Sequence, residues 1–261
     1  MSDQILLKLG GSVLTDKGSP GVVDRAAMER IAKDLAAYAQ GSLCIVHGAG
    51  SFGHPEAHRY GIAHGSQSPH VREGIALTHG AVCTLNGTLV GVLRGAGIPA
   101  IGIHPLGSAW ASNGALVALE TRPIAALMAL GLVPVLHGDV VMDGTRGTTI
   151  VSGDQIVRFL AEKVPFTRVG LATDVPGVLG PDGRVIQEIG WDDGRVVHVG
   201  RSSYTDVTGG MGGKLRELQE LAKKGTTSDI FHVSRLADFL EGRPHGGTSV
   251  KGREVTWTRN D

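Results

Sequence analysis

Residues 42–61 read SLCIVHGAGSFGHPEAHRYG. The apolar run at residues 43–46 is typical of a buried strand. Gly48, Gly50 and Gly53 follow it directly and spell G-x-G-x-x-G, the pattern of a turn that holds the phosphates of a dinucleotide. The stretch therefore predicts a strand, a glycine loop and a helix in succession, and it leaves open which phosphate the loop holds.

Strands and helices alternate on both sides of this stretch. Apolar runs bounded by turn residues predict strands at residues 4–9, 42–47, 98–103, 133–138 and 168–173. Helical spacing of apolar residues predicts helices at about residues 24–40, 69–93, 121–130, 152–164 and 209–225. Asp-Gly turns predict hairpins within residues 140–151 and 173–186, and the alternation continues to residues 254–258. This order implies a largely parallel sheet with helices on both faces.

Several residues mark the ends of the predicted helices. Asp24 caps the helix that follows it, and Ser152 does the same with Gln155 as a capping box, in which each side chain bonds a backbone N–H group. Gly225 ends the helix before it. Pro55 favours the first position of a helix, so the helix after the glycine loop is expected to begin there, after the last glycine.

Composition limits the class of protein. The chain has 261 residues, of which 41% are hydrophobic and 19% charged, and its net charge is zero. This length suits one large α/β domain or two lobes that share a sheet, with any boundary near residues 164–168. Neutrality argues against a nucleic-acid partner, and the lack of an uninterrupted apolar run of about 18 residues argues against a membrane span. Cys44 and Cys83 lie in apolar contexts and are expected to be buried thiols in a reducing cytoplasm.

A dinucleotide site fits the glycine loop poorly. That site uses the turn after the first strand, with its helix beginning inside the glycines, whereas this loop follows the second strand and precedes Pro55. Glu73 lies about 20 residues further on, but it follows the polar residues 66–70 instead of ending a strand. The loop is therefore expected to hold a different phosphate.

Three further segments offer backbone amides or a lysine to an anion. They are residues 8–12 (KLGGS), 152–154 (SGD) and 208–214 (TGGMGGK). The last is not a Walker loop, because Thr208 replaces its first glycine and Leu215 replaces the Ser/Thr that binds magnesium. Most of these segments open helices, whose N-termini favour negative charge. Together with the glycine loop at residues 48–53, these make four anion-binding segments, which suit two phosphate-bearing ligands that face each other.

The ordered set of motifs resembles the amino acid kinase family. The motifs are KLGGS (8–12), HGAGSFGHP (47–55), SGD (152–154), TDVPGV (173–178) and DVTGGM (206–211) with Lys214. They cover nearly the whole chain, and within the family the histidine-containing loop is most similar to that of the isopentenyl phosphate kinases. Three positions depart from the family pattern, namely Ala49, Pro176 and Gly212. The third removes a positive charge and leaves Lys214 alone near the nucleotide.

This resemblance implies a fold and a reaction. The fold is an open αβα sandwich with a mainly parallel central sheet, formed by a single domain over residues 1–261. Residues 1–165 bind the acceptor and residues 166–261 the nucleotide. The reaction is ATP-dependent phosphorylation of isopentenyl phosphate to isopentenyl diphosphate, with Mg²⁺ arriving on ATP. A cytoplasmic homodimer is also implied. Such an acceptor is already ionised near neutral pH, since the second pKa of a phosphate monoester is about 6.

The resemblance also assigns site residues. Those implied in catalysis are Lys8, Lys17, His54, Asp154 and Lys214. Those implied in ATP binding are Lys8, Leu9, Gly10, Gly11, Ser12, Gly50, Asp174, Gly210 and Lys214. Those implied in acceptor binding are Ala49, Gly53, His54 and Gly153. The helix from Val71 to Ile75 is the expected wall of the pocket for the hydrocarbon tail.

Other readings of the sequence stay open. The nearest is a fosfomycin kinase, whose acceptor is a small phosphonate held by a similar histidine. A non-catalytic sensor with the same fold and an NAD oxidoreductase are more distant, since a sensor need not keep Lys8, Lys17, Asp154 and Lys214. No H-x-x-x-H or H-E-x-x-H pair pins a metal, so no protein-held metal site is predicted.

Overall fold

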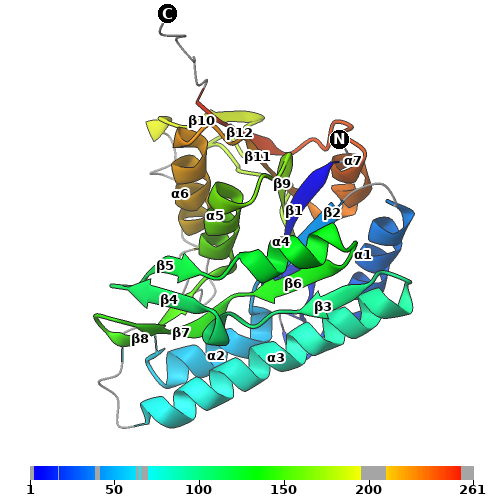
Figure 1. Cartoon of the computed structure of the whole chain (residues 1–261). Helices are drawn as coiled ribbons and strands as arrows, with labels where there is room; N and C mark the ends of the chain where they lie inside the picture. Colours follow the sequence, from blue (N-terminus) through cyan, green and yellow to red (C-terminus); the bar gives the residue numbers. More distant parts are fainter. Residues whose placement is uncertain are drawn as a thin grey trace, which may run out of the picture.

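A computed structural model describes residues 3–16, 18–38, 42–62, 65, 70–194 and 210–253. An eight-stranded sheet runs through the middle, in the order β10-β12-β11-β9-β1-β2-β6-β3 (Figure 1). Its strands are β1 (Gln4–Leu9), β2 (Ser42–His47), β3 (Ala100–Gly102), β6 (Val133–His137), β9 (Arg168–Thr173), β10 (Glu188–Gly190), β11 (Ser228–His232) and β12 (Thr248–Lys251). Within it only β11 and β12 pair antiparallel, so the predicted mainly parallel sheet is confirmed.

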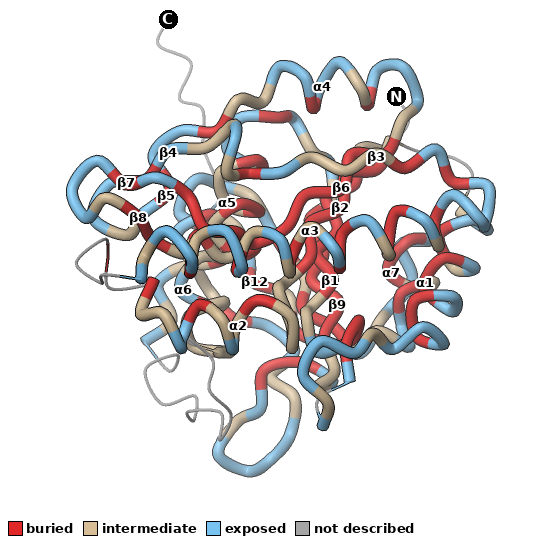
Figure 2. The backbone as a smooth tube through the Cα atoms, turned by 90° about the horizontal axis from the view of Figure 1, so that it is seen from below, coloured by how far each residue is buried: buried red, intermediate tan, exposed pale blue. Residues whose placement is uncertain are grey.

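Helices cover both faces of this sheet. They are α1 (Arg25–Ala37), α2 (Gly50–Arg59), α3 (Val71–Gly95), α4 (Arg122–Ala129), α5 (Gly153–Lys163), α6 (Gly210–Lys223) and α7 (Leu236–Leu240). Alternate residues of β1 point to opposite faces: Ile5 and Leu7 join a core with α1, α3 and α7, and Leu6 joins a core with α4, α5 and α6. The central strands are accordingly buried on both sides (Figure 2).

A second, four-stranded sheet has the order β5-β4-β7-β8. The hairpin of β7 (Asp139–Asp143) and β8 (Gly147–Val151) agrees with the prediction. The hairpin of β4 (Ala109–Ser112) and β5 (Ala115–Leu119) was not predicted, although Asn113-Gly114 carries its signal. Both turn residues have positive φ, 51° and 84°, as a two-residue hairpin turn requires.

The predicted start of α2 is wrong. This helix begins at Gly50, inside the glycine loop, and Pro55 lies in its interior. Proline has no N–H group to bond the carbonyl of Ser51, four residues earlier, and that carbonyl instead accepts a bond of 3.1 Å from Gly21 N. A partner from another loop therefore satisfies the freed carbonyl. Because α2 begins inside the glycines, its start no longer argues against a dinucleotide turn. The position of the loop after the second strand still argues against one.

The other predicted helix ends are confirmed, with one change. Asp24 accepts a bond of 2.8 Å from Ala27 N, and Ser152 accepts one of 3.2 Å from Gln155 N. The Gln155 side chain does not complete a capping box, because it accepts a bond from Leu116 N in β5. The hairpin predicted at residues 173–186 forms only one antiparallel bridge pair, and residues 254–258 lie outside the described residues.

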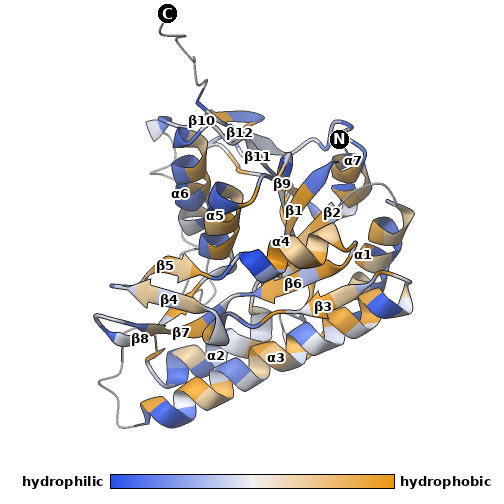
Figure 3. Cartoon of the chain, in the orientation of Figure 1, coloured by the Kyte–Doolittle hydropathy of each residue, from blue (hydrophilic) through white to orange (hydrophobic). Residues whose placement is uncertain are grey.

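The helix α3 is the one described helix that is long and apolar enough to cross a membrane. Its most apolar 18-residue window has a mean hydropathy of 1.4, and 39% of that window is buried. Hydrophobic residues run along much of its length (Figure 3). Leu85, Leu89 and Leu93 are fully buried in the core, and a core helix meets the same criterion, so this helix is weak evidence for a membrane span.

Candidate active site

One cavity of about 810 Å³ lies at the carboxyl ends of the central strands. All four predicted phosphate-binding segments contribute to its lining: the loops after β1 and β2 and the starts of α5 and α6. The carboxyl ends of parallel strands meet at one edge of a sheet, where ligands of such folds bind. The strand order therefore brings together segments that are up to about 200 residues apart in the chain.

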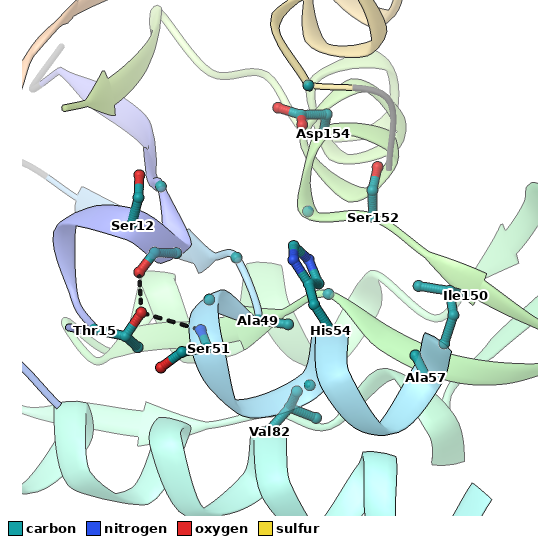
Figure 4. A pocket seen from close by; sticks show the side chains of 18 of the residues that line it. Ser12, Thr15, Ala49, Ser51, His54, Ala57, Val82, Ile150, Ser152 and Asp154 are labelled. Atoms are coloured by element: carbon teal, nitrogen blue, oxygen red, sulfur yellow. Dashed lines mark hydrogen bonds between the residues drawn. The ribbon is translucent and has the colours of Figure 1, made fainter. Parts of the chain in front are cut away.

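The floor of the cavity is backbone packed on backbone. A Cβ atom added to Gly48 would lie 2.7 Å from Gly11 N, and one added to Gly11 would overlap Gly50 N. Gly50 also has a φ of +53°, which favours glycine. The Thr15 hydroxyl joins the same two loops, since it donates to Gly11 O and accepts from Ser51 N at 3.1 Å (Figure 4). The loops after β1 and β2 thus pack closely on each other through glycine backbone.

The substitution Gly11→Ala is expected to separate these loops. A shift of about 1 Å in positioning groups can cost about 100-fold in rate, so kcat/KM should fall by about that factor for both substrates. Gly80→Ala is the matched control, because a Cβ at Gly80 in α3 meets no atom within 4 Å. It should leave kcat unchanged and stabilise the fold by about 0.5–1 kcal/mol. Steady-state kinetics and thermal denaturation are measured for both variants. Normal activity of Gly11→Ala would show that the close packing of the two loops at Gly11 is not needed for the reaction.

Two lysines share one carboxylate at the opposite wall. Lys8 Nζ lies 2.6 Å from Asp154 Oδ1, and Lys214 Nζ lies 3.3 Å from the same oxygen. The side chains are 6%, 9% and 13% exposed for Lys8, Asp154 and Lys214. Lys8 comes from the end of β1, Asp154 from the capped first turn of α5 and Lys214 from the N-terminal part of α6. When all three are ionised, the cluster has a net charge of +1 and faces the cavity.

Burial and mutual attraction shift the pKa values of this cluster. Burial lowers the pKa of Lys8 to about 8, although the charge of Asp154 opposes this. Burial raises the pKa of Asp154, but the charges of Lys214 and Lys8 outweigh it and bring that pKa to about 2. The stability from the Asp154 carboxylate is therefore present above about pH 4, the unfolded value, and is lost as the pH falls towards 2.

The pKa of Lys8 leads to a prediction for the alkaline limb of the pH profile. In the free protein Lys8 loses its proton as the pH rises through about 8, so kcat/KM for ATP should fall there. A bound triphosphate favours the charged amine, so kcat should persist to higher pH. In Lys8→Arg the guanidinium stays charged and the fall should move to higher pH. A wild-type profile of kcat/KM that stays flat through this range would contradict the assignment.

Most of the predicted site residues line the cavity. The structure brings these predicted residues together: Lys8, Gly10, Gly11, Ser12, Ala49, Gly50, Gly53, His54, Gly153, Asp154, Asp174, Gly210 and Lys214. His54 points from α2 into the cavity, towards the turn at Ser152 (Figure 4). The Leu9 side chain is buried in the core instead of the cavity, so only its backbone can serve ATP. Lys17 and Thr208 lie outside the described residues.

One end of the cavity is apolar. Ala57, Val82 and Ile150 line it, together with Thr78. The predicted wall from Val71 to Ile75 is wrong, because α3 presents its second and third turns to the cavity. The first turn of α3 instead packs on the end of α2: a Cβ added to Gly74 would lie 2.5 Å from Tyr60 Cβ. The position of the wall depends on how α2 and α3 pack, which residue spacing does not reveal.

Comparisons with known proteins agree with this geometry. A model of the amino acid kinase family matches residues 3–232. The chain is 38% identical to the isopentenyl phosphate kinase of Methanothermobacter thermautotrophicus, over 95% of this chain and 99% of that protein. It is 39% identical to that of Haloferax volcanii, over 95% and 98%. An X-ray structure of isopentenyl phosphate kinase superposes with a TM-score of 0.84 at 35% identity, over 95% of this chain and 100% of that one. A carbamate kinase from Giardia lamblia, at 15% identity and a TM-score of 0.67, shares the fold alone.

Proposed function

The chain belongs to the amino acid kinase family, and on that premise we propose that it transfers the γ-phosphoryl group of ATP to isopentenyl phosphate. It is a phosphotransferase, and its product is isopentenyl diphosphate. One observation supports isopentenyl phosphate as the acceptor. The same cavity has a charged side, formed by Lys8, Asp154 and Lys214, and an apolar wall. The cavity suits a phosphate joined to a short hydrocarbon tail.

The two substrates divide this cavity. The triphosphate contacts Lys8, Gly10 and Gly11 on one side and Gly210 and Lys214 on the other. The acceptor's phosphate lies on Ala49, Gly53, His54 and Gly153, and its tail extends towards Val82 and Ile150. Support comes from the cavity lining, which contains all of these residues. On this proposal residues 1–165 form the acceptor half and residues 166–261 the nucleotide half, and the loop after β1 in the first half also contacts the triphosphate.

The chain's residues act by charge and position. An oxygen of the acceptor's phosphate attacks the γ-phosphorus, the bond from that phosphorus to the β–γ bridging oxygen breaks, and ADP leaves. The attacking oxygen is already ionised, so no general base is needed. Lys8 and Lys214 neutralise charge on the transferred group, and Asp154 holds both ammonium groups towards it. Lys17 is proposed for the same task on the strength of its motif alone.

The residues that line the cavity are compatible with Mg²⁺ bound together with ATP. Among the residues that the structure describes, the carboxylates lining the cavity are Asp139, Asp154 and Asp174. Asp139 bonds His79 and backbone amides, and Asp154 bonds two lysines. Asp174, whose TDVPGV motif belongs to the proposed nucleotide side and which lines the cavity, is the residue that would hold Mg²⁺. Phosphate oxygens and water would supply most of its ligands. When bound, the ion would neutralise charge on the phosphates.

A homodimer in the cytoplasm is the proposed state. Support for the dimer comes from exposed apolar side chains on α3 and on the β4–β5 hairpin, with Leu77, Trp110 and Val117 exposed by 43%, 49% and 52%. Support for a reducing compartment comes from Cys44 and Cys83, which are free thiols. Sedimentation velocity measures the oligomeric state.

An ATP-consumption assay tests the acceptor. Isopentenyl phosphate, dimethylallyl phosphate and fosfomycin are compared by kcat/KM, with NAD binding as a negative control. The expected order puts isopentenyl phosphate above fosfomycin, because only its tail fills the apolar end beside Val82 and Ile150. A higher kcat/KM for fosfomycin would replace this proposal with the phosphonate kinase.

A further inference from the structure

A second polar cluster lies beside the acceptor end of the cavity, outside the lysine cluster. It joins Cys83 on α3, His104 after β3 and His137 at the end of β6. One donor atom from each residue lies within 4.8 Å of the other two. Nothing in the proposed phosphoryl transfer uses these three side chains.

The hydrogen bonds of His137 determine where its lone pair lies. His137 is fully buried, and its Nδ1 lies 3.1 Å from the carbonyl oxygen of Gly138. A carbonyl only accepts, so Nδ1 carries the proton and Nε2 presents a lone pair. That Nε2 lies 2.8 Å from His104 Nδ1, and Cys83 Sγ lies 3.4 Å from the same Nδ1. Two imidazole nitrogens and one sulfur therefore lie close together, all within 4.8 Å of one another.

We propose that Cys83 Sγ, His104 Nδ1 and His137 Nε2 bind a divalent cation of the zinc class. Imidazole nitrogen and thiolate sulfur are the ligands that zinc takes, at about 2.0–2.1 Å and 2.3 Å, and Mg²⁺ prefers oxygen. In a tetrahedral site these lengths separate the donors by about 3.3–3.6 Å. The sulfur–nitrogen distance of 3.4 Å matches this range. The nitrogen pair at 2.8 Å must open, and this requires the ring of the solvent-exposed His104 to turn away from His137.

The surroundings support three protein ligands and one water. The bond from His137 to Gly138 O is the kind of outer contact that orients a metal-binding histidine. His79 lies close but bonds Asp139, and Cys83 Sγ lies 3.4 and 3.7 Å from its two nitrogens, off the axis of either lone pair. The cluster opens to solvent at His104, which leaves the fourth position to water.

Metal binding changes the protons in a defined way. Without the ion, His104 donates its Nδ1 proton to His137 Nε2. With the ion bound, the His104 proton moves to Nε2 of its own ring, and the Cys83 thiol releases one proton to solvent as the thiolate bond forms. One proton per ion should therefore leave the protein, with no change of oxidation state.

The site would fasten the acceptor side of the cavity. Gly138 and Asp139, which follow His137, line the cavity, and α3 carries both Cys83 and the cavity residue Val82. An ion bound by these ligands would join α3, the loop after β3 and the end of β6. The cation is therefore expected to raise the melting temperature without taking part in phosphoryl transfer.

Cobalt(II) is the probe for this site, because its bound thiolate gives a near-ultraviolet charge-transfer band. Untagged protein is stripped with a chelator and titrated with Co²⁺ in the absence of nucleotide. We expect one ion per chain with the charge-transfer band and tetrahedral visible bands, displaced by Zn²⁺ but not by Mg²⁺. Cys83→Ala should abolish the band, and His104→Ala should weaken binding by at least about 100-fold, since outer contacts alone cost 10–100-fold.

Cys44→Ala is the matched control, since Cys44 is the other thiol and is fully buried in the core. It should keep the band. Absence of a thiolate band in the wild-type protein, or a band that survives Cys83→Ala, would overturn the proposal and leave the cluster as a hydrogen-bonded network. Because the readout needs no turnover, the result is separate from the test of the acceptor.

Discussion

Lys8→Ala should lower kcat by about 10²–10³, or roughly 3–4 kcal/mol, in a protein that still folds. The ammonium group of Lys8 is buried, lies against Asp154 and faces the cavity, so no water or other side chain can replace it without reorganisation. Lys214→Ala should show a loss of similar size, because its ammonium group shares the same carboxylate. Single-turnover kinetics with saturating ATP separates the chemical step from binding.

Loss of folding must be distinguished from loss of charge in these variants. Lys8→Met keeps most of the side-chain volume and removes only the charge, so it is the matched variant for Lys8→Ala. Asp154 keeps Lys214 as a partner in both, which limits the cost of an unpaired buried carboxylate. Circular dichroism and thermal denaturation check the fold. Near-normal kcat in folded Lys8→Met would reduce Lys8 to a structural ion pair.

His54→Ala should impair use of the acceptor far more than use of ATP. His54 points into the cavity from α2, next to the glycine floor that is proposed to hold the acceptor's phosphate (Figure 4). A hydrogen bond to a charged group contributes about 1.5–3 kcal/mol, so kcat/KM for isopentenyl phosphate should fall by about 10- to 100-fold. His54→Gln keeps a donor and should recover part of the loss.

The paired KM values for isopentenyl phosphate and for ATP are the measurement for His54. They are compared among the wild type, His54→Ala and His54→Gln at matched pH. His58→Ala is a useful control, because His58 lies one turn further along α2 and also lines the cavity. If His54→Ala raises the KM for ATP and leaves that for the acceptor unchanged, the proposed positions of the two substrates are reversed.

The sequence predicts correctly those strands that are marked by a continuous run of apolar residues. The apolar runs of β1, β2, β6 and β9 are buried strands because both faces of the sheet are covered by helices. The start of α2 was predicted wrongly because the carbonyl freed by Pro55 finds its partner, Gly21 N, in a distant loop. The β4–β5 hairpin was missed although Asn113-Gly114 is a strong turn signal.

The site shows the same division between local and distant information. The glycine segments and the capped turn at Ser152 were visible as separate anion sites, but their meeting in one cavity depends on strand order. Thr15, which joins the two glycine loops, gives no signal as a single hydroxyl residue in a loop. Cys83, His104 and His137 come from three elements, so no spacing along the chain announces their meeting.

The position of β1 in the sheet governs how the chain can be synthesised and truncated. Gln4 pairs with Ser42, only 38 residues away, but Ile5 also pairs with Arg168, after most of the chain has been made. Until then one edge of this apolar strand has no neighbour, and an unpaired apolar edge invites aggregation. A fragment ending at residue 165 would keep that edge permanently. Residues 1–165 are therefore expected to fold together with β9 and the residues after it, as a single cooperative unit.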